Sequence, residues 1–173
     1  MVETAAAEDV RAQYRDIIIE ILEFRARHEP SAAEYLEHGE FQTPTNLTTT
    51  EWALLDEMDE TIGFEPKGCY YNSQLAALGW EEVKYVEGYV VTGTTGIPFQ
   101  HAWLEFIESG HLVEVTLADH LREPELDVYY GKSFDTETIA AQQGDLGTAS
   151  PLAGDAIDWE PARDMGSGVD DKT

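Results

Sequence analysis

Hydrophobic positions in the first part of the chain recur at the spacing of a helix face. Apolar side chains return every three or four residues over 8–27, with charges between them, which predicts an amphipathic helix. A short second helix is expected over 31–36, and residues 41–47, which contain proline, are expected to form a loop. The sequence 48–51, Thr-Thr-Thr-Glu, matches a capping box and predicts a third helix that ends at Gly63.

Beyond residue 64 the pattern changes to the alternation of β-strands. A helix is expected over 70–78 and a last one over 135–142. Strands are expected over 83–92, 97–107 and 111–117, with a short strand or packed turn over 127–134. The expected fold class is α+β: N-terminal helices, then a cysteine-bearing helix packed on an antiparallel sheet of three or four strands.

The same pattern divides the chain into three regions. Residues 1–63 form an N-terminal helical region, and 64–143 form the core that carries the candidate chemistry. Residues 144–173 are acidic and rich in Gly, Ala, Ser and Pro, so a disordered tail is expected there, with Trp159 as a residue that can dock.

Composition supports a folded domain inside a cell. The 173 residues are 42% hydrophobic, and no run of about 18 apolar residues predicts a membrane span. The N-terminus lacks the basic-then-apolar pattern of a secretion signal. A single cysteine cannot form an intramolecular disulfide, which fits a reducing environment. We therefore expect a cytoplasmic protein.

The charge is extreme, with 35 acidic against 10 basic residues and a net charge of −25. Such a chain repels phosphate backbones and anionic lipids, so neither nucleic acid nor membrane is an expected partner. One interpretation is a disordered acidic interaction protein. The other is a folded domain from a high-salt cytoplasm, and four Trp and eight Tyr favour this halophilic interpretation.

The candidate chemistry centres on Cys69, the only cysteine, which follows Gly68 at an expected helix start. The positive end of a helix dipole stabilises a thiolate, and the neighbouring Lys67 adds positive charge. His101, on a later strand, is the candidate base, and Glu114, on the next strand, is the candidate carboxylate that orients it. Each has a structural alternative, because lone cysteines and histidines flanked by aromatics are often core residues. No metal or cofactor is expected, since no ligand motif is present.

The choice of carboxylate depends on the hairpin. A two-residue turn at Ser109-Gly110 places Glu114 opposite Glu105, roughly 13 Å along the strand from His101. Glu114 then reaches the histidine only through a wider loop or a bulge. With the tight turn, Asp119 instead lies at the end of the strand near His101, although the alternation of side chains points it away from the face that carries the histidine. Glu114 is the first choice and Asp119 the second.

Other polar residues are weaker candidates. Asn72 and Gln74 either line the site or lie on the surface. Gln42 or Asn46 can supply a second oxyanion donor, beside the backbone N–H of Cys69.

Several segments carry a resemblance to a known family. They are Cys69-Tyr70-Tyr71-Asn72, Tyr85-Val86-Glu87-Gly88-Tyr89, His101-Ala102-Trp103, Leu112-Val113-Glu114-Val115-Thr116 and Tyr129-Tyr130-Gly131. Together they resemble small phage and bacterial proteins that are similar to the transglutaminase-like and papain-like cysteine hydrolase superfamily. The resemblance covers roughly residues 64–134 and departs from the family at the acid, where Asp-Pro-Thr is replaced by Glu-Val-Thr.

The resemblance implies acyl transfer to water or an amine, from an amide or ester, through a thioester on Cys69. It implies Cys69, His101 and Glu114 as the catalytic residues and an unidentified peptide or acyl substrate. The alternative is a non-catalytic member of the same fold, structural or binding, of viral type. A third possibility is an acidic interaction protein that acts through its tail.

Overall fold

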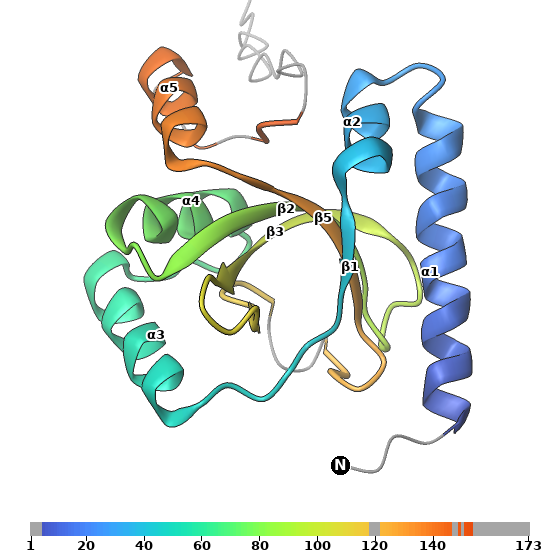
Figure 1. Ribbon diagram of the computed structural model, residues 1–173, viewed down its shortest axis with the longest axis horizontal. Helices are drawn as coiled ribbons and strands as arrows, with labels where there is room; N and C mark the ends of the chain where they lie inside the picture. Colours follow the sequence, from blue (N-terminus) through green and yellow to red (C-terminus); the bar gives the residue numbers. More distant parts are fainter. Residues whose placement is uncertain (1–4, 118–121, 147–148, 150, 154–173) are drawn as a thin grey trace, which may run out of the picture.

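The computed structural model describes residues 5–117, 122–146, 149 and 151–153, which form helices around a five-stranded antiparallel sheet (Figure 1). The elements in chain order are α1 (Ala5–Arg25), α2 (Pro30–His38), β1 (Glu40–Gln42), α3 (Thr49–Ile62), α4 (Cys69–Gly79), β2 (Val83–Val91), β3 (Phe99–Phe106), β4 (Leu112–Val113), β5 (Val128–Phe134) and α5 (Thr136–Leu146). The strand order is β1-β5-β2-β3-β4. The α+β class is confirmed, and the sheet has one or two strands more than expected.

Local signals in the sequence set the ends of α3. The Thr48 side chain accepts from the Glu51 backbone N–H at 3.2 Å, and the Glu51 side chain accepts from the Thr48 N–H at 2.6 Å. Gly63 ends the helix with φ of 69°, and its N–H donates to Asp59 O at 2.7 Å. The predicted capping box and glycine stop are both confirmed.

The helices and the sheet share two apolar clusters on one face. On β2, Tyr85 and Tyr89 point to the same side because side chains alternate along a strand. Tyr85 belongs to a cluster with Ala76 of α4, and Tyr89 to a cluster with Leu22 of α1. The helices α1 and α2 pack at the β5 side and α4 at the β3 side (Figure 1). The opposite face carries a third cluster: Val86, Val90, Trp103, Leu112 and Tyr129.

Two glycines let the middle strands approach closely. Gly88 of β2 pairs with both His101 of β3 and Gly131 of β5. A Cβ on Gly88 would lie 2.1 Å from the Tyr130 carbonyl oxygen. A Cβ on Gly131 would lie 2.5 Å from Cη2 of Trp103. The indole of Trp103 therefore lies against the bare backbone at Gly131.

A buried carboxylate links the sheet to the last described residues. Glu87 of β2 is fully buried and accepts from the hydroxyls of Tyr35 at 2.8 Å and Tyr85 at 2.5 Å. It also accepts from the backbone N–H groups of Leu152 at 2.9 Å and Ala153 at 2.6 Å. Four donors offset the cost of burying the charge.

Three boundaries differ from the sequence expectations. β1 begins at Glu40 and overlaps the start of the expected loop 41–47; it lies at the sheet edge, where it pairs with β5. β4 covers only two residues of the expected strand 111–117. The helix α5 continues past 143, and Leu152 and Ala153 pack against the apolar clusters. Trp159 and the rest of the expected tail, 154–173, lie outside the described residues. Nowhere in the described chain does a helix have the length and apolar content of a membrane span.

Candidate functional site

Cys69 is the first residue of α4 and is partly exposed. As a first helical residue it has a backbone N–H with no acceptor inside the helix. The turn before it is held by Asn72, which is fully buried. The Asn72 side chain accepts from the Glu65 N–H at 3.1 Å and donates to the Glu65 carbonyl at 2.9 Å. Asn72 thus closes the turn that delivers the thiol.

The backbone of this turn is strained. Lys67 adopts φ of 69°, in the left-handed region that residues with a Cβ rarely use. At the next position, a Cβ on Gly68 would lie 3.2 Å from the Glu65 carbonyl oxygen. Strained backbone of this kind is concentrated at functional sites.

His101 lies on β3 and is 3% exposed. Its ring stacks on Trp103, with centroids 6.5 Å apart and an interplanar angle of 19°. Phe99 meets the ring edge-on at 6.0 Å. Among the described residues, β4 pairs only with Leu104 and Glu105 of β3, so no strand covers that edge of the sheet at His101. The aromatic neighbours fix the orientation of the imidazole.

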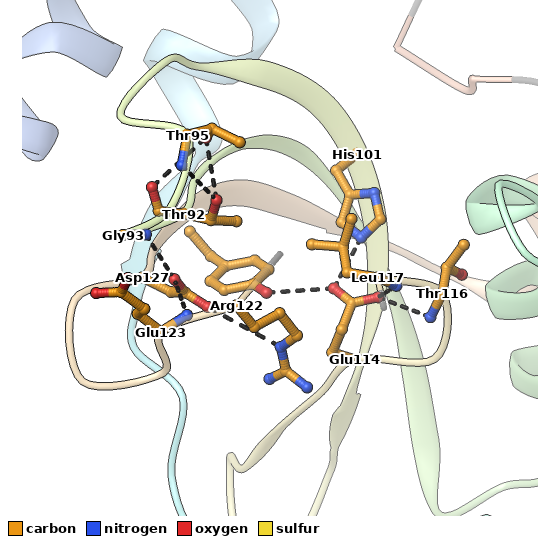
Figure 2. A network of polar contacts seen from close by, with 11 residues as sticks. Thr92, Gly93, Thr95, His101, Glu114, Thr116, Leu117, Arg122, Glu123 and Asp127 are labelled. Carbon is orange, nitrogen blue, oxygen red and sulfur yellow. Dashed lines mark hydrogen bonds and ion pairs between the residues drawn. The ribbon is translucent and has the colours of Figure 1, made fainter. Parts of the chain in front are cut away.

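Glu114 receives four hydrogen bonds on a side chain that is fully buried. Its Oε2 accepts from His101 Nε2 at 2.8 Å and from the Tyr129 hydroxyl at 3.2 Å. Its Oε1 accepts from the backbone N–H groups of Thr116 at 2.8 Å and Leu117 at 2.9 Å, as Figure 2 shows. A carboxylate only accepts, so Nε2 of His101 carries the proton in this pair.

The pKa values follow from this geometry. Burial acts to raise the pKa of Glu114, but the charge and hydrogen bond of His101, with the two backbone N–H groups, hold it below its ordinary value. Burial acts to lower the pKa of His101, but the Glu114 carboxylate and a hydrogen bond with Cys69 raise it to about 9. Since Nε2 faces Glu114, Nδ1 is the nitrogen available to the thiol. A 2.8 Å hydrogen bond therefore joins His101 to Glu114, and Cys69 lies close enough to His101 to raise the pKa of its imidazole.

The hairpin explains how Glu114 reaches the histidine. The tight turn at Ser109-Gly110 does not form; instead Phe106 N–H donates to His111 O at 2.9 Å, which encloses residues 107–110. Gly110 adopts φ of 72°, and Leu104 pairs with Val113. This register places residue 114 beside Trp103, one diagonal step from His101. Asp119, the second candidate, lies outside the described residues.

Two residues that were considered as oxyanion donors occupy other positions. The Gln42 side-chain oxygen accepts from Trp103 Nε1 at 2.6 Å, and its amide nitrogen donates to Glu105. Gln42 thus holds the indole that stacks on His101. Asn46 is exposed. The backbone N–H of Cys69 is the donor that the geometry supports.

Asn72 and Gln74 are both fully buried and do not lie on the surface. Besides closing the turn, Asn72 donates to Thr116 Oγ1 at 3.3 Å, which ties the start of α4 to the segment after β4. Gln74 donates to the Tyr85 hydroxyl at 3.4 Å and accepts from Gln143 at 3.1 Å. Both residues therefore support the helix behind the thiol.

The sequence analysis missed Tyr129 as a residue of the site. Its hydroxyl reaches Glu114 from β5, so the contact depends on strand pairing. Next to it, Asp127 is fully buried and accepts from the N–H groups of Gly93 at 2.8 Å and Glu123 at 3.1 Å. Arg122 Nε lies 3.9 Å from its Oδ2 (Figure 2).

A second histidine–carboxylate pair has a structural role. Glu51 accepts from His111 Nδ1 at 3.0 Å and from Ser109 Oγ at 2.6 Å. Because the serine hydroxyl donates to the acid and not to the imidazole, this set lacks the order of a serine nucleophile and its base. It joins the start of α3 to the hairpin loop.

Within the described residues, no group of three potential ligands is placed to hold a metal ion. Comparisons with known proteins found no matching protein family, no similar curated protein and no similar solved structure. The resemblance to transglutaminase-like hydrolases therefore stays a prediction.

Proposed function

We propose that the protein catalyses cysteine-dependent acyl transfer or hydrolysis, acting on an amide or ester through a thioester on Cys69. One observation carries the proposal: Glu114 accepts a hydrogen bond from Nε2 of His101, and Cys69, at the start of a helix, lies close enough to the same imidazole to raise its pKa. A nucleophile, a base and an orienting acid in this order are the parts that acyl transfer needs. The backbone N–H of Cys69 adds an oxyanion donor.

The reaction would proceed in two halves. His101 Nδ1 takes the thiol proton, and the thiolate attacks the acyl carbon to give a tetrahedral intermediate whose oxyanion accepts from the Cys69 N–H. The carbon bond to the leaving group breaks as Nδ1 returns the proton to that group, which leaves a thioester. Water or an amine then attacks the thioester carbon and loses a proton to Nδ1. The proton returns to the sulfur, and the product leaves with the thiol restored.

Glutamate in place of the family's aspartate is compatible with this role. Glu114 follows directly after β4, and its longer side chain reaches Nε2 while two backbone N–H groups hold the other oxygen. His101 then keeps its Nε2 proton, and Nδ1 is left to exchange protons with the thiol.

An activated ester tests the proposal without knowledge of the natural substrate. Incubation with p-nitrophenyl acetate at neutral pH in molar KCl is expected to place one acetyl group on Cys69, detected by intact-mass and peptide mass spectrometry. Cys69→Ala is expected to abolish the modification. His101→Ala should slow it by about 10²–10⁴-fold, the usual contribution of a general base.

His111→Ala is the matched control, since His111 also bonds a carboxylate but lies away from this chain of contacts. It should acetylate at the wild-type rate. Equal rates for wild type and His101→Ala would show ordinary thiol reactivity and contradict the proposal. In that case a binding or structural role of the same fold becomes the better interpretation.

A further inference from the structure

Among the described residues, Tyr129 is the one side chain besides His101 that donates to Glu114. It lies on β5, pairs with Val90 of the central strand β2 and is fully buried. Its hydroxyl donates at 3.2 Å to Oε2, the same oxygen that accepts from His101 Nε2 at 2.8 Å. The two donors therefore share one oxygen, while the backbone occupies the other.

Aromatic packing fixes the position of the phenol ring. Tyr129 meets the Trp103 indole edge-on, with centroids 5.1 Å apart and an angle of 71°. Trp103 in turn stacks on His101. Gly88, which pairs with His101 on the strand between, adds no side chain to this face. The tyrosine can lose its hydroxyl without losing its ring contacts, so the hydroxyl and the ring can be tested separately.

The surroundings keep Tyr129 a donor at every pH at which the site works. Burial, and then the negative charge of Glu114, raise its pKa well above the ordinary value; Arg122 opposes this and Asp127 adds to it. The groups that donate to the shared oxygen are therefore a neutral phenol and an imidazole whose pKa Cys69 also raises.

We infer that Tyr129 is a positioning residue of the site: by sharing Oε2 with His101, it anchors the carboxylate and limits how strongly that carboxylate holds the proton of the imidazolium. When one oxygen accepts two hydrogen bonds, it attracts each donor less strongly than it would attract a single donor. This matters for acyl transfer because His101 must both accept a proton and release it. The inference rests on the proposed function for its meaning, but it concerns an equilibrium that exists without any substrate.

The test is an NMR titration of His101 in protein whose Cys69 is replaced by alanine, which removes the coupled thiol. Tyr129→Phe is expected to raise the pKa of His101 by about half a unit to one unit, as Glu114 then serves a single side-chain donor. Tyr130→Phe is the matched control. It is the neighbouring tyrosine of the same strand, but its hydroxyl donates to the Tyr35 carbonyl oxygen at 3.1 Å. It should leave the titration unchanged.

A second variant covers the case in which Tyr129→Phe does not fold. Site-specific 3-fluorotyrosine at position 129 keeps the ring and makes the hydroxyl a stronger donor, so the pKa of His101 should move down. Opposite shifts in the two variants support the inference, as does the downward shift alone if the phenylalanine variant fails. An unchanged titration in the fluorinated protein overturns it.

The two proposals fail in different ways. If acetylation of Cys69 does not depend on His101, the enzyme proposal is wrong, whatever the titration shows. If acetylation depends on His101 while substitution of Tyr129 leaves the titration unchanged, only the role of Tyr129 is wrong.

Discussion

Glu114 places a negative charge in a fully buried position, which a fold tolerates only when hydrogen bonds replace the lost water. Each oxygen has two donors, one pair from side chains and one pair from the backbone. The backbone pair comes from Thr116 and Leu117, just after the glutamate itself. The acid is thus fixed locally at one oxygen and presents the other to His101.

Replacement of this acid is expected to change how stability depends on pH. The pKa of His101 is about 9 in the folded protein against an ordinary 6.5, so the folded state binds more protons between these values. The resulting stability is fully present below about 6.5 and is lost as pH rises through about 9. Glu114→Gln removes the charge that holds the proton. Denaturant unfolding from pH 6 to 10 in molar KCl should show a loss of a few kcal/mol in the wild type and a flatter curve in the variant.

Asp119→Asn is the control for this assignment, because Asp119 was the second candidate for the acid. Because Glu114 is the acid that bonds Nε2 of His101, Asp119→Asn should show the same dependence of unfolding free energy on pH as the wild type. A slope that disappears in Asp119→Asn and persists in Glu114→Gln would transfer the role to Asp119. Glu114 itself makes stability depend on pH in the opposite direction. Because its pKa is lowered in the folded state, it stabilises the fold at pH values above its ordinary pKa of 4.5, and this stability is lost as the pH falls.

At the scale of elements, glycines in the central strands leave room for the indole of Trp103, which stacks on His101. Gly131→Ala is expected to destabilise the protein by about 1–3 kcal/mol, the usual cost of overpacking. The new Cβ would lie 2.5 Å from Trp103 and 2.6 Å from the Glu87 carbonyl oxygen, and a backbone atom of a central strand cannot move away easily. The displaced indole should also slow acetylation of Cys69. Denaturant midpoints and the acetylation rate measure both effects.

Gly79→Ala is the matched control for this substitution. Gly79 is the last residue of α4, and nothing lies within 4 Å of an added Cβ. The Gly79→Ala protein should be as stable as the wild type or slightly more stable, because alanine lowers the conformational entropy of the unfolded chain. Equal destabilisation by both substitutions would contradict the packing argument.

The elements that carried local signals were the ones that the sequence predicted well. The capping box and Gly63 delimited α3, alternation predicted the strand at β2, and the strand-like run around His101 predicted β3. The three residues of β1 carry no such signal, because their place in the sheet comes from backbone pairing with β5. The pattern over 111–117 alternates like a strand, yet β4 stops at Val113, since the next residue turns its carboxylate to the following N–H groups.

The candidate site shows the same division. Chain order, residue type and the family resemblance together selected Cys69, His101 and Glu114 as candidates. In the structure Glu114 lies 2.8 Å from His101, and Cys69 raises the pKa of that histidine. Their catalytic role stays a prediction. The roles of Asn72 and Tyr129 were beyond the sequence. One depends on the shape of a turn and the other on a partner that follows β4, three strands away from β5 in the sheet, and neither can be read from spacing along the chain.

At the scale of the whole molecule, Glu87 joins parts that the sequence analysis had separated. Its donors come from α2, from β2 itself and from the segment at 152–153, so the expected helical region, the core and the expected tail all meet at one carboxylate. A buried charge with donors from distant segments leaves few alternative packings, because each alternative leaves donors or acceptors unpaired. The three regions of the sequence therefore share one polar centre.

The net charge of −25 makes a prediction about the whole fold. Compact structure brings 35 acidic side chains together with only 10 basic ones, so repulsion should destabilise the folded state when screening is weak. The screening length falls from about 30 Å at 0.01 M salt to about 3 Å at 1 M. Circular dichroism melts from 0.01 to 1 M KCl should show a rise of about 5 °C or more in Tm, equivalent to roughly 1–2 kcal/mol for a chain of this size.

The shape of the salt dependence separates screening from a general salt effect. Screening should raise Tm mostly below about 0.15 M, where the screening length has already fallen to about 8 Å. Exclusion of salt from the protein surface instead grows steadily to high concentration, as potassium sulfate in a parallel series would show. A Tm in 0.01 M KCl that equals or exceeds the value at 1 M would contradict the halophilic interpretation. It would favour the acidic interaction protein, because the charge would then need an explanation other than a high-salt environment.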